Sequence, residues 1–321
     1  MKPVGMIAVG IDIGGTNIKL GLVDRDAGFL EKTSFSTEAR KGKVYMFDKL
    51  GEKIHELLAE YPQTPVGIGV GIPGMVSLDR STVKSPPNLP GWSIENVAHE
   101  IQNRIDLPCV IENDANVAAL GSAFYGAGKP HEHFIMLTLG TGVGGGIIIG
   151  KKLYRGTTGA AAELGHVLID YKGAESNSNT RGGIEAYLGQ RFISRRAAAE
   201  IKKHPDNPLY KQFSSDFNEL EPLDLSQAAN KGNTLAIEIL ANAGEMLGYA
   251  IVNYIHMLDI RKIVLSGGVA NAGKWIIEPA KKSALNYLMP PFHDDFEIII
   301  ERLGNDAAML GAAALAFEVF S

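Results

Sequence analysis

The sequence has a single cysteine, no long apolar run and no excess of basic charge. With Cys109 alone among 321 residues, no intramolecular disulfide can form, and a reducing, cytoplasmic location is expected. No eighteen consecutive residues are apolar, and the short apolar run Met6–Ile13 contains Asp12, so neither a transmembrane helix nor a signal peptide is expected. The formal net charge of −5 argues against a nucleic-acid-binding protein, which would usually be basic.

Glycine, by contrast, is abundant. The chain has 37 glycines among its 321 residues, well above the roughly 7% of an average protein. Apolar residues make up 45% and charged residues 21%, which is typical of a globular chain, and the length predicts two domains. The glycines gather in a few tight clusters, which the sequence places at the ends of predicted strands.

A strand–turn–strand pattern occurs twice. Residues 6–24 predict a hairpin around residues 14–16, and residues 134–150 predict a second one around residues 140–142, about 126 positions later. We interpret this as an internal duplication. The segment 202–223 is polar and irregular and is expected to form a surface excursion. Further strands are expected near 29–35, 66–72, 109–111, 262–266 and 296–302, and helices near 47–58, 94–105, 114–125, 234–258 and 306–320.

Three glycine turns follow predicted strands and could bind phosphate through successive backbone N–H groups. A carboxylate beside such a turn would repel phosphate unless a cation lies between them, so Asp12 suggests Mg²⁺ held through water. Any one of these turns alone is more often just a tight turn. The spacing of Gly140, Gly142 and Gly145 also fits a dinucleotide fingerprint, but a strand rather than a helix is predicted to follow. The candidate nucleotide-binding residues are Asp12, Gly14, Gly15, Thr16, Thr138, Gly140, Thr141, Gly142, Gly267 and Gly268.

Acidic residues suggest where an acceptor would bind. Asp114 lies where a short predicted strand gives way to a helix, so it could be an N-cap, a general base for an alcohol, or both. Glu163, His166 and Glu185 suit a polyhydroxyl ligand, because each carboxylate can accept hydrogen bonds from two hydroxyls. A metal site and simple surface charge are the alternatives for this second group.

In this order and spacing, the motifs resemble the ROK family of sugar kinases and repressors, within the actin-like/sugar-kinase ATPase superfold. The resemblance runs through nearly the whole chain. The motifs that support it are Asp12-Ile-Gly-Gly-Thr16, Gly71-Ile-Pro-Gly74, Asn88-Leu-Pro-Gly-Trp92, Glu112-Asn-Asp-Ala-Asn116, Leu139-Gly-Thr-Gly-Val-Gly-Gly-Gly146, Glu163-Leu-Gly-His166, Gly183-Ile-Glu185 and Ser266-Gly-Gly268.

The resemblance implies an enzyme that transfers phosphate from ATP to the 6-hydroxyl of a hexose, with glucose as the best fit. Asp114 would be the catalytic base. The first two glycine turns would hold the ATP phosphates, and Gly267 and Gly268 the adenosine. The sugar would be bound by Gly74, Asn88, Asn113, Glu163, His166 and Glu185.

The implied architecture is α/β, with two ribonuclease-H-like lobes, each a mixed sheet flanked by helices, and an active-site cleft between them. We expect one lobe to comprise residues 1–115 and 305–321 and the other to comprise residues 116–304. Closure of the lobes on the sugar would exclude water and limit wasteful hydrolysis of ATP. A homodimer formed through the second lobe is also implied.

One departure from the family pattern concerns zinc. Many members bind a structural zinc with a histidine and three cysteines, and here the aligned cysteine positions hold Ser176, Ser178 and Gly183 beside His166. Serine and glycine supply no thiolate, so we predict no zinc site. The loop 171–183 must then be held by packing or hydrogen bonds, or be mobile.

Other functions compete with that of a glucose kinase. A sugar-responsive repressor would carry an N-terminal helix-turn-helix, for which a first strand that starts by residue 6 leaves no room. A sugar sensor without catalysis would not need Asp114. Within the kinases, the alternatives to glucose are N-acetylhexosamines, fructose and allose.

Overall fold

The computed structural model of the protein describes residues 5–321, and the chain divides into two compact units. The first unit comprises Met1–His133, Gly146–Ala162 and Arg302–Ser321, and the second comprises Phe134–Gly145 and Glu163–Glu301. This division differs from the expected boundary at residue 115, because the helix that begins at Asp114 belongs to the first unit. The return of the C-terminal helix to the first unit agrees with the expectation.

The first unit is built on a five-stranded sheet with the order β3-β2-β1-β4-β8. β1 pairs with β2 in the antiparallel sense, as the predicted hairpin requires, while β1, β4 and β8 are parallel. Asp12 of β1 is in register with Gly71 of β4, and Gly71 is in register with Glu112 of β8. The carboxyl ends of these three strands therefore meet at one edge of the sheet. The strands are β1 (Ile7–Ile13), β2 (Asn17–Asp24), β3 (Gly28–Ser36), β4 (Ile68–Ile72) and β8 (Cys109–Asn113).

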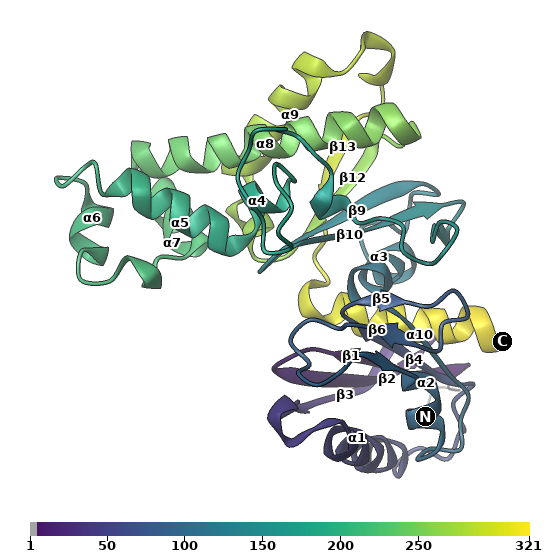
Figure 1. Cartoon of the computed structure of the whole chain (residues 1–321). Coiled ribbons are helices and arrows are strands. Elements are labelled where there is room, and N and C mark those ends of the chain that lie inside the picture. The colour runs from purple at the N-terminus through teal and green to yellow at the C-terminus, as the bar shows by residue number, and fades with distance from the viewer. Residues whose placement is uncertain (1–4) are drawn as a thin grey trace. The chain divides into compact units, whose positions relative to one another are not determined.

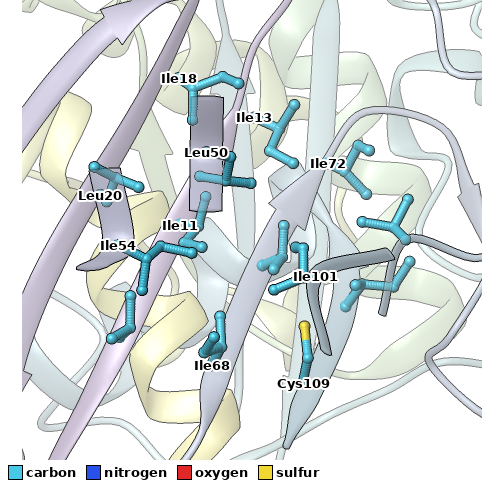
Figure 2. Close-up of a cluster of buried hydrophobic side chains, with 14 of the residues drawn as sticks. Ile11, Ile13, Ile18, Leu20, Leu50, Ile54, Ile68, Ile72, Ile101 and Cys109 are labelled. Atoms are coloured by element: carbon cyan, nitrogen blue, oxygen red, sulfur yellow. The ribbon is translucent and has the colours of Figure 1, made fainter. Parts of the chain in front are cut away.

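Helices cover both faces of this sheet. Alternate apolar side chains of β1 and β2, such as Ile11 and Leu20, pack with α1 (Lys43–Leu58) and α2 (Val97–Gln102) in the core that Figure 2 shows. Cys109 lies in the same core, where burial raises the pKa of its thiol, so it is no reactive nucleophile. In Figure 1, α10 (Ala307–Phe320) lies on the opposite face of the sheet from α1, and α10 also packs against α3 (Asp114–Tyr125).

Several glycines of the first unit serve packing rather than ligand binding. On the α10 face, a Cβ added to Gly10 would lie 2.0 Å from the carbonyl oxygen of Met309. Between α3 and α10, a Cβ on Gly311 would lie 1.6 Å from the carbonyl oxygen of Val117. The backbones approach so closely that only glycine fits. Part of the glycine excess is therefore a consequence of the fold.

The second five-stranded sheet repeats the design of the first. Its order is β11-β10-β9-β12-β13, which matches the first sheet strand for strand in chain order and supports the predicted duplication. β12 is parallel to both β9 and β13. The strands are β9 (Phe134–Leu139), β10 (Val143–Ile149), β11 (Lys152–Leu153), β12 (Lys262–Ser266) and β13 (Glu297–Ile300). A separate small sheet in the first unit contains β5 (Met75–Val76), β6 (Val83–Lys84) and β7 (Ile94–Glu95).

The second unit contributes most of the remaining helices. The longest, α8 (Thr234–Leu258), is long and apolar enough to span a membrane. However, 56% of its most apolar segment is buried inside the protein, as in a core helix. It packs side by side with α9 (Lys274–Tyr287), as Figure 1 shows. The others are α4 (Glu185–Leu188), α5 (Gln190–Ile201), α6 (Pro208–Phe213) and α7 (Pro222–Asn230). The 3₁₀ turns are Ala39–Lys41, Leu164–His166, Phe217–Glu219, Val269–Ala272, Pro290–Phe292 and Gly304–Asp306.

Two expectations about secondary structure are corrected. The helix expected over residues 94–105 is shorter, because Ile94 and Glu95 form β7 and the side chain of Asn96 caps α2 by accepting from the His99 N–H. The segment 202–223 is not simply an irregular excursion. It contains α6, whose Leu209 and Phe213 are buried.

The close approach of α3 and α10 predicts a large cost for Gly311→Ala. The added methyl would meet the Val117 carbonyl at 1.6 Å and the Gly121 nitrogen at 2.5 Å, and both are backbone atoms that cannot move alone. We expect a loss of about 3 kcal/mol in the free energy of unfolding, or about 5 °C in Tm, measured by thermal denaturation. The control is Gly268→Ala, where φ is −61° and no atom lies within 4 Å of the new Cβ. Equal Tm values for the two variants would contradict this account of the packing.

Candidate functional site

In the first unit, the candidate residues gather at the carboxyl edge of the sheet. The register of β1, β4 and β8 places Asp12 and the turn after it, Gly74 and Asn113 at the same edge. Open α/β sheets bind their ligands at this edge. The side-chain amide of Asn113 donates to the carbonyl oxygen of Gly74 at 3.2 Å, which joins two of the predicted sugar-binding positions directly.

The first glycine turn is held by a residue that the sequence did not single out. Thr37 is fully buried; its hydroxyl donates to the Gly14 carbonyl at 2.6 Å and its N–H to the Thr16 carbonyl at 2.9 Å. No motif pointed to Thr37, because Gly14 and Thr16, the two residues to which it donates, both lie more than twenty positions earlier in the sequence. The turn also packs against Asn88, whose Cβ lies 2.6 Å from where a Gly15 Cβ would be. Asn88 thus lies beside the phosphate-turn candidate.

Asp12 is a partly buried carboxylate with a cationic neighbour. Burial raises the pKa of Asp12, and the ammonium of Lys19, 3.3 Å away, opposes that shift. A raised pKa means that the ionised form costs folding free energy above that pKa, a cost that is common at functional sites. Mg²⁺ is usually bound by one or two carboxylates together with water and phosphate oxygens. A single accessible carboxylate beside a phosphate turn fits that requirement, so Asp12 could hold Mg²⁺ through water.

Asp114 is the first residue of α3, but it is not the N-cap. Asn113 takes that position, and its side-chain oxygen accepts from the N–H groups of Ala115 at 2.9 Å and Asn116 at 3.2 Å. The Asp114 carboxylate accepts a further bond from the Ala115 N–H at 2.9 Å. Of the two roles left open for Asp114, capping therefore belongs to Asn113. The positive end of the helix dipole stabilises an anion at Asp114.

The second unit brings the other two glycine turns to one edge of its sheet. Ser266 of β12 is in register with Thr138 of β9, so the turns after both strands are neighbours. Gly267 has a φ of 93°, and a Cβ there would lie 2.3 Å from the Leu139 carbonyl oxygen, so this position requires glycine. The Gly140 carbonyl accepts from the Gln190 N–H at 2.8 Å, which ties the second turn to the start of α5.

Glu185 is in direct contact with the second glycine turn. Its Oε2 accepts from the Val143 N–H at 3.1 Å and lies 2.4 Å from where a Gly142 Cβ would be. A predicted sugar-binding acid and a predicted phosphate turn thus share a hydrogen bond within one unit. The sequence places these residues more than forty positions apart, and their contact is a tertiary result.

Glu163 is the N-cap of the 3₁₀ turn Leu164–His166, and His166 is its last residue. The Glu163 carboxylate and the His166 ring nitrogen are 3.8 Å apart, and both side chains are well exposed. The buried hydroxyl of Tyr254 donates to the Leu164 carbonyl at 2.7 Å and anchors the turn. Within residues 5–321, no group of three or more His, Cys, Asp or Glu side chains could hold a metal ion. The metal-site alternative for these acids therefore has no support here.

In the loop where zinc ligands were predicted to be missing, Ser176 and Ser178 form a ring of hydroxyls with Thr180, which is not one of the aligned positions. The hydroxyls of Ser176, Ser178 and Thr180 lie 2.7–3.0 Å from one another, and that of Ser178 lies 3.4 Å from Nδ1 of His166. Gly183 lies against His166, since its Cβ would be 3.3 Å from the His166 Cα. Three hydroxyls and an imidazole do not fit a tetrahedral zinc site, which needs thiolate, imidazole or carboxylate ligands. Hydrogen bonds take the place of coordination in this loop.

This arrangement predicts that the purified protein holds no stoichiometric zinc. Elemental analysis measures the zinc content, and one tightly held zinc per chain would refute the prediction. The triple change Ser176→Cys, Ser178→Cys and Gly183→Cys supplies the matched control, because it places three thiols beside His166. We expect that variant to take up zinc when the wild-type chain does not.

Comparison with known proteins identifies the family of the chain. Residues 8–319 match the sequence model of the ROK family. The chain is 33% identical to a glucokinase of Thermotoga maritima over 97% of both chains, and 25% identical to the xylose repressor of Bacillus subtilis over 98% of this chain and 77% of the repressor. The crystal structure of a ROK family glucokinase from Streptomyces griseus in complex with glucose and AMPPNP superposes with a TM-score of 0.82 and 31% identity, covering 97% of this chain and 99% of the other. The chain therefore belongs to the ROK family and has the two-sheet α/β fold of its sugar kinases.

Proposed function

We propose that this protein is an ATP-dependent sugar kinase that phosphorylates the 6-hydroxyl of a hexose, with glucose preferred. The observation that supports this most is Asp114, a carboxylate at a helix N-terminus beside the glycine turn and Asp12. Phosphoryl transfer to an alcohol needs a carboxylate that orients the hydroxyl and accepts its proton.

In the proposed reaction, the hexose oxygen forms a bond to the γ-phosphorus while the bond to the departing ADP breaks. Asp114 accepts the proton of the 6-hydroxyl. The backbone N–H groups of the turns at Gly14–Thr16 and Gly140–Gly142 hold the phosphates, and the turn at Gly267–Gly268 holds the adenosine. Mg²⁺, held by Asp12 through water, would supply positive charge against the phosphate oxygens when bound. The sugar is bound by Gly74, Asn88, Asn113, Glu163, His166 and Glu185.

The preference for glucose is supported by relatives. The Thermotoga maritima relative is named a glucokinase, and the Streptomyces griseus structure was determined with glucose and AMPPNP. N-acetylhexosamine, fructose and allose kinases would use the same base and the same turns. A pocket that hydrogen-bonds each hydroxyl can discriminate by roughly 10⁴–10⁵ when one is missing, so substrate assays separate these alternatives.

A sugar-responsive regulator is the second candidate, because the chain also resembles a xylose repressor. The net charge of −5 disfavours DNA binding. The two functions differ in a simple observation: a kinase releases ADP in the presence of hexose, whereas a regulator binds the sugar and leaves ATP intact.

The decisive assay measures ADP release by the wild-type protein and by the variant Asp114→Asn, with glucose, fructose, allose and an N-acetylhexosamine as substrates. We expect the highest kcat/KM for glucose. In the variant, kcat should fall about 10²–10⁴-fold, the usual contribution of a general base, while sugar binding persists. Asp224→Asn, another first-turn acid, in α7 of the second unit, serves as control and should keep its kcat. Sugar binding without any ADP release in the wild-type protein would reject the kinase, and an unchanged kcat in Asp114→Asn would reject the base.

We also propose that the protein is a cytoplasmic homodimer that associates through the second unit. The surface that supports this is an apolar patch where the exposed ends of α8 and α9 meet: Tyr249 stacks edge-on against Tyr287, and His256 against Phe292. Met257, next to His256 in the chain, is 70% exposed, and Met289, two residues after Tyr287, is 55% exposed; we include both in the patch. Exposed apolar clusters of this kind mark association sites.

The dimer predicts a change in mass when the patch is charged. Met257→Glu should shift the protein from dimer to monomer in sedimentation equilibrium, because the partner would have to bury a carboxylate. Leu223→Glu places the same charge on an exposed leucine of α7, outside the patch, and should leave the mass unchanged. A monomeric wild-type protein would refute the proposed association.

A further inference from the structure

A fully buried carboxylate lies two residues before Asp114. Glu112, in β8, has no exposed surface, and its Oε2 lies 2.6 Å from Nε of Arg155 and 3.4 Å from Nε of Arg80. Its other oxygen accepts from the Asn113 N–H at 2.9 Å and from the side-chain amide of Asn116 at 3.1 Å. One carboxylate thus contacts two guanidinium groups, the N-cap residue Asn113 and the side chain of Asn116 in the first turn of α3.

This cluster is costly to bury. Two guanidinium groups face one buried carboxylate, and Glu318 is a further acid that acts on Arg80. Burial lowers the pKa of Arg80, a shift that Glu112 opposes and Arg155 reinforces. Within residues 5–321, the buried side-chain atoms that lack a hydrogen bond are Nε of Arg80, Nε of Arg155, Oε2 of Glu112 and Oδ1 of Asn116. The close ion pairs are therefore not aligned as hydrogen bonds.

Stability does not explain such a cluster. Buried ion pairs often contribute less to stability than apolar side chains of the same volume, because desolvation offsets the attraction between the charges. Buried polar atoms without partners add to the cost. A cluster that is expensive for folding and lies against the proposed catalytic base is better explained by the reaction.

The cluster joins three segments of the first unit. The guanidinium of Arg155 donates to the carbonyl oxygens of Leu78 at 2.7 Å and Ser77 at 2.9 Å. The carbonyl of Arg80, which has a left-handed φ of 59°, accepts from the Ile111 N–H in β8. Glu112 therefore lies where residues 77–80, the end of β8 and the segment that follows Arg155 meet.

We propose that Glu112, held by Arg155 and Arg80, is a positioning residue that fixes Asp114 for proton transfer. It acts through two residues close to Asp114 in the chain: it accepts the N–H of Asn113, the N-cap of α3 that precedes Asp114, and it holds the side chain of Asn116, two residues after Asp114. The proposal rests on the proposed function, since only there is Asp114 the base. It assigns a role to a motif residue that was not among the candidate site residues.

Glu112→Gln tests the proposal. The amide keeps an oxygen that can accept from Asn113 and Asn116, but it loses the charge that holds the two arginines. A displacement of about 1 Å at a reacting group can cost about 10²-fold, so we expect kcat to fall ten- to hundred-fold. The dissociation constants of glucose and AMPPNP, measured by calorimetry, should change less than about threefold.

A double-mutant cycle separates positioning from general damage. If Glu112 acts through Asp114, Glu112→Gln should lower kcat much less in the Asp114→Asn background than in the wild type. The same fold loss in both backgrounds would overturn the proposal, and so would a kcat of Glu112→Gln within twofold of wild type. Glu112→Asp, which keeps the charge, should recover part of the lost activity.

The matched control is Asp24→Asn. Asp24 is another buried carboxylate of the first unit, at the far end of β2, and it accepts three backbone N–H groups, from Gly5, Asp26 and Ala27. Those bonds, chiefly the one from Ala27, lower the pKa of Asp24, so its loss should reduce Tm at neutral pH. We expect no change in kcat, because Asp24 lies at the opposite edge of the sheet from Asp12.

A second variant and a second measurement keep the proposal testable if Glu112→Gln does not fold or if the protein has no kinase activity. If Glu112→Gln does not fold, Arg155→Lys replaces it, since lysine keeps the charge but cannot bond both carbonyls and the carboxylate together. Hydrogen exchange at the amides of residues 113–116 needs no catalytic activity and should quicken in either variant. If the wild-type protein has no kinase activity, the proposed function fails by itself, and unchanged exchange at these amides would then overturn the positioning of α3 as well.

Discussion

The in-register pairing of three parallel strands is the constraint on which the first unit depends. Asp12, Gly71 and Glu112 lie side by side across β1, β4 and β8, so whatever follows each strand is delivered to one edge. The glycine turn, Gly74 and Asp114 are brought together in this way, although they are separated by up to a hundred residues. On one face of this sheet, α10 packs directly on the strand backbone at glycine positions such as Gly10, where no side chain would fit.

The charged groups at this edge are arranged at the expense of stability. Burial raises the pKa of Asp12 against the effect of Lys19, and Glu112 is buried between two arginines whose ion pairs with it are not aligned as hydrogen bonds. Such groups lower the free energy of unfolding and are retained where a reaction needs them. The loop near His166 is the reverse case, because ordinary hydrogen bonds join the hydroxyls of Ser176, Ser178 and Thr180 there.

The local sequence pattern was sufficient to predict long periodic helices and hairpins with glycine turns. The helices at residues 114–125 and 234–258 and the two hairpins were predicted correctly, since apolar spacing and glycine turns specify them without distant partners. The helix expected at 94–105 was wrong because Ile94 pairs with a neighbouring strand, and no local spacing reveals that partner. The boundary between the units also moved, because α3 packs on α10, a helix that lies almost two hundred residues further along the chain.

By itself, the sequence determined the duplicated fold, the three glycine turns and the set of motifs that resembles the ROK family, because these depend on residue type and short spacing. The tertiary structure alone decided that Asn113 rather than Asp114 caps α3, that Thr37 braces the first turn, that Glu185 touches the second, and that Glu112 is enclosed by Arg80 and Arg155. Each of these is a contact of a side chain, with the backbone or with another side chain, that only folding brings about. No pattern along the chain records such contacts, because their energy depends on burial and direction rather than on order in the sequence.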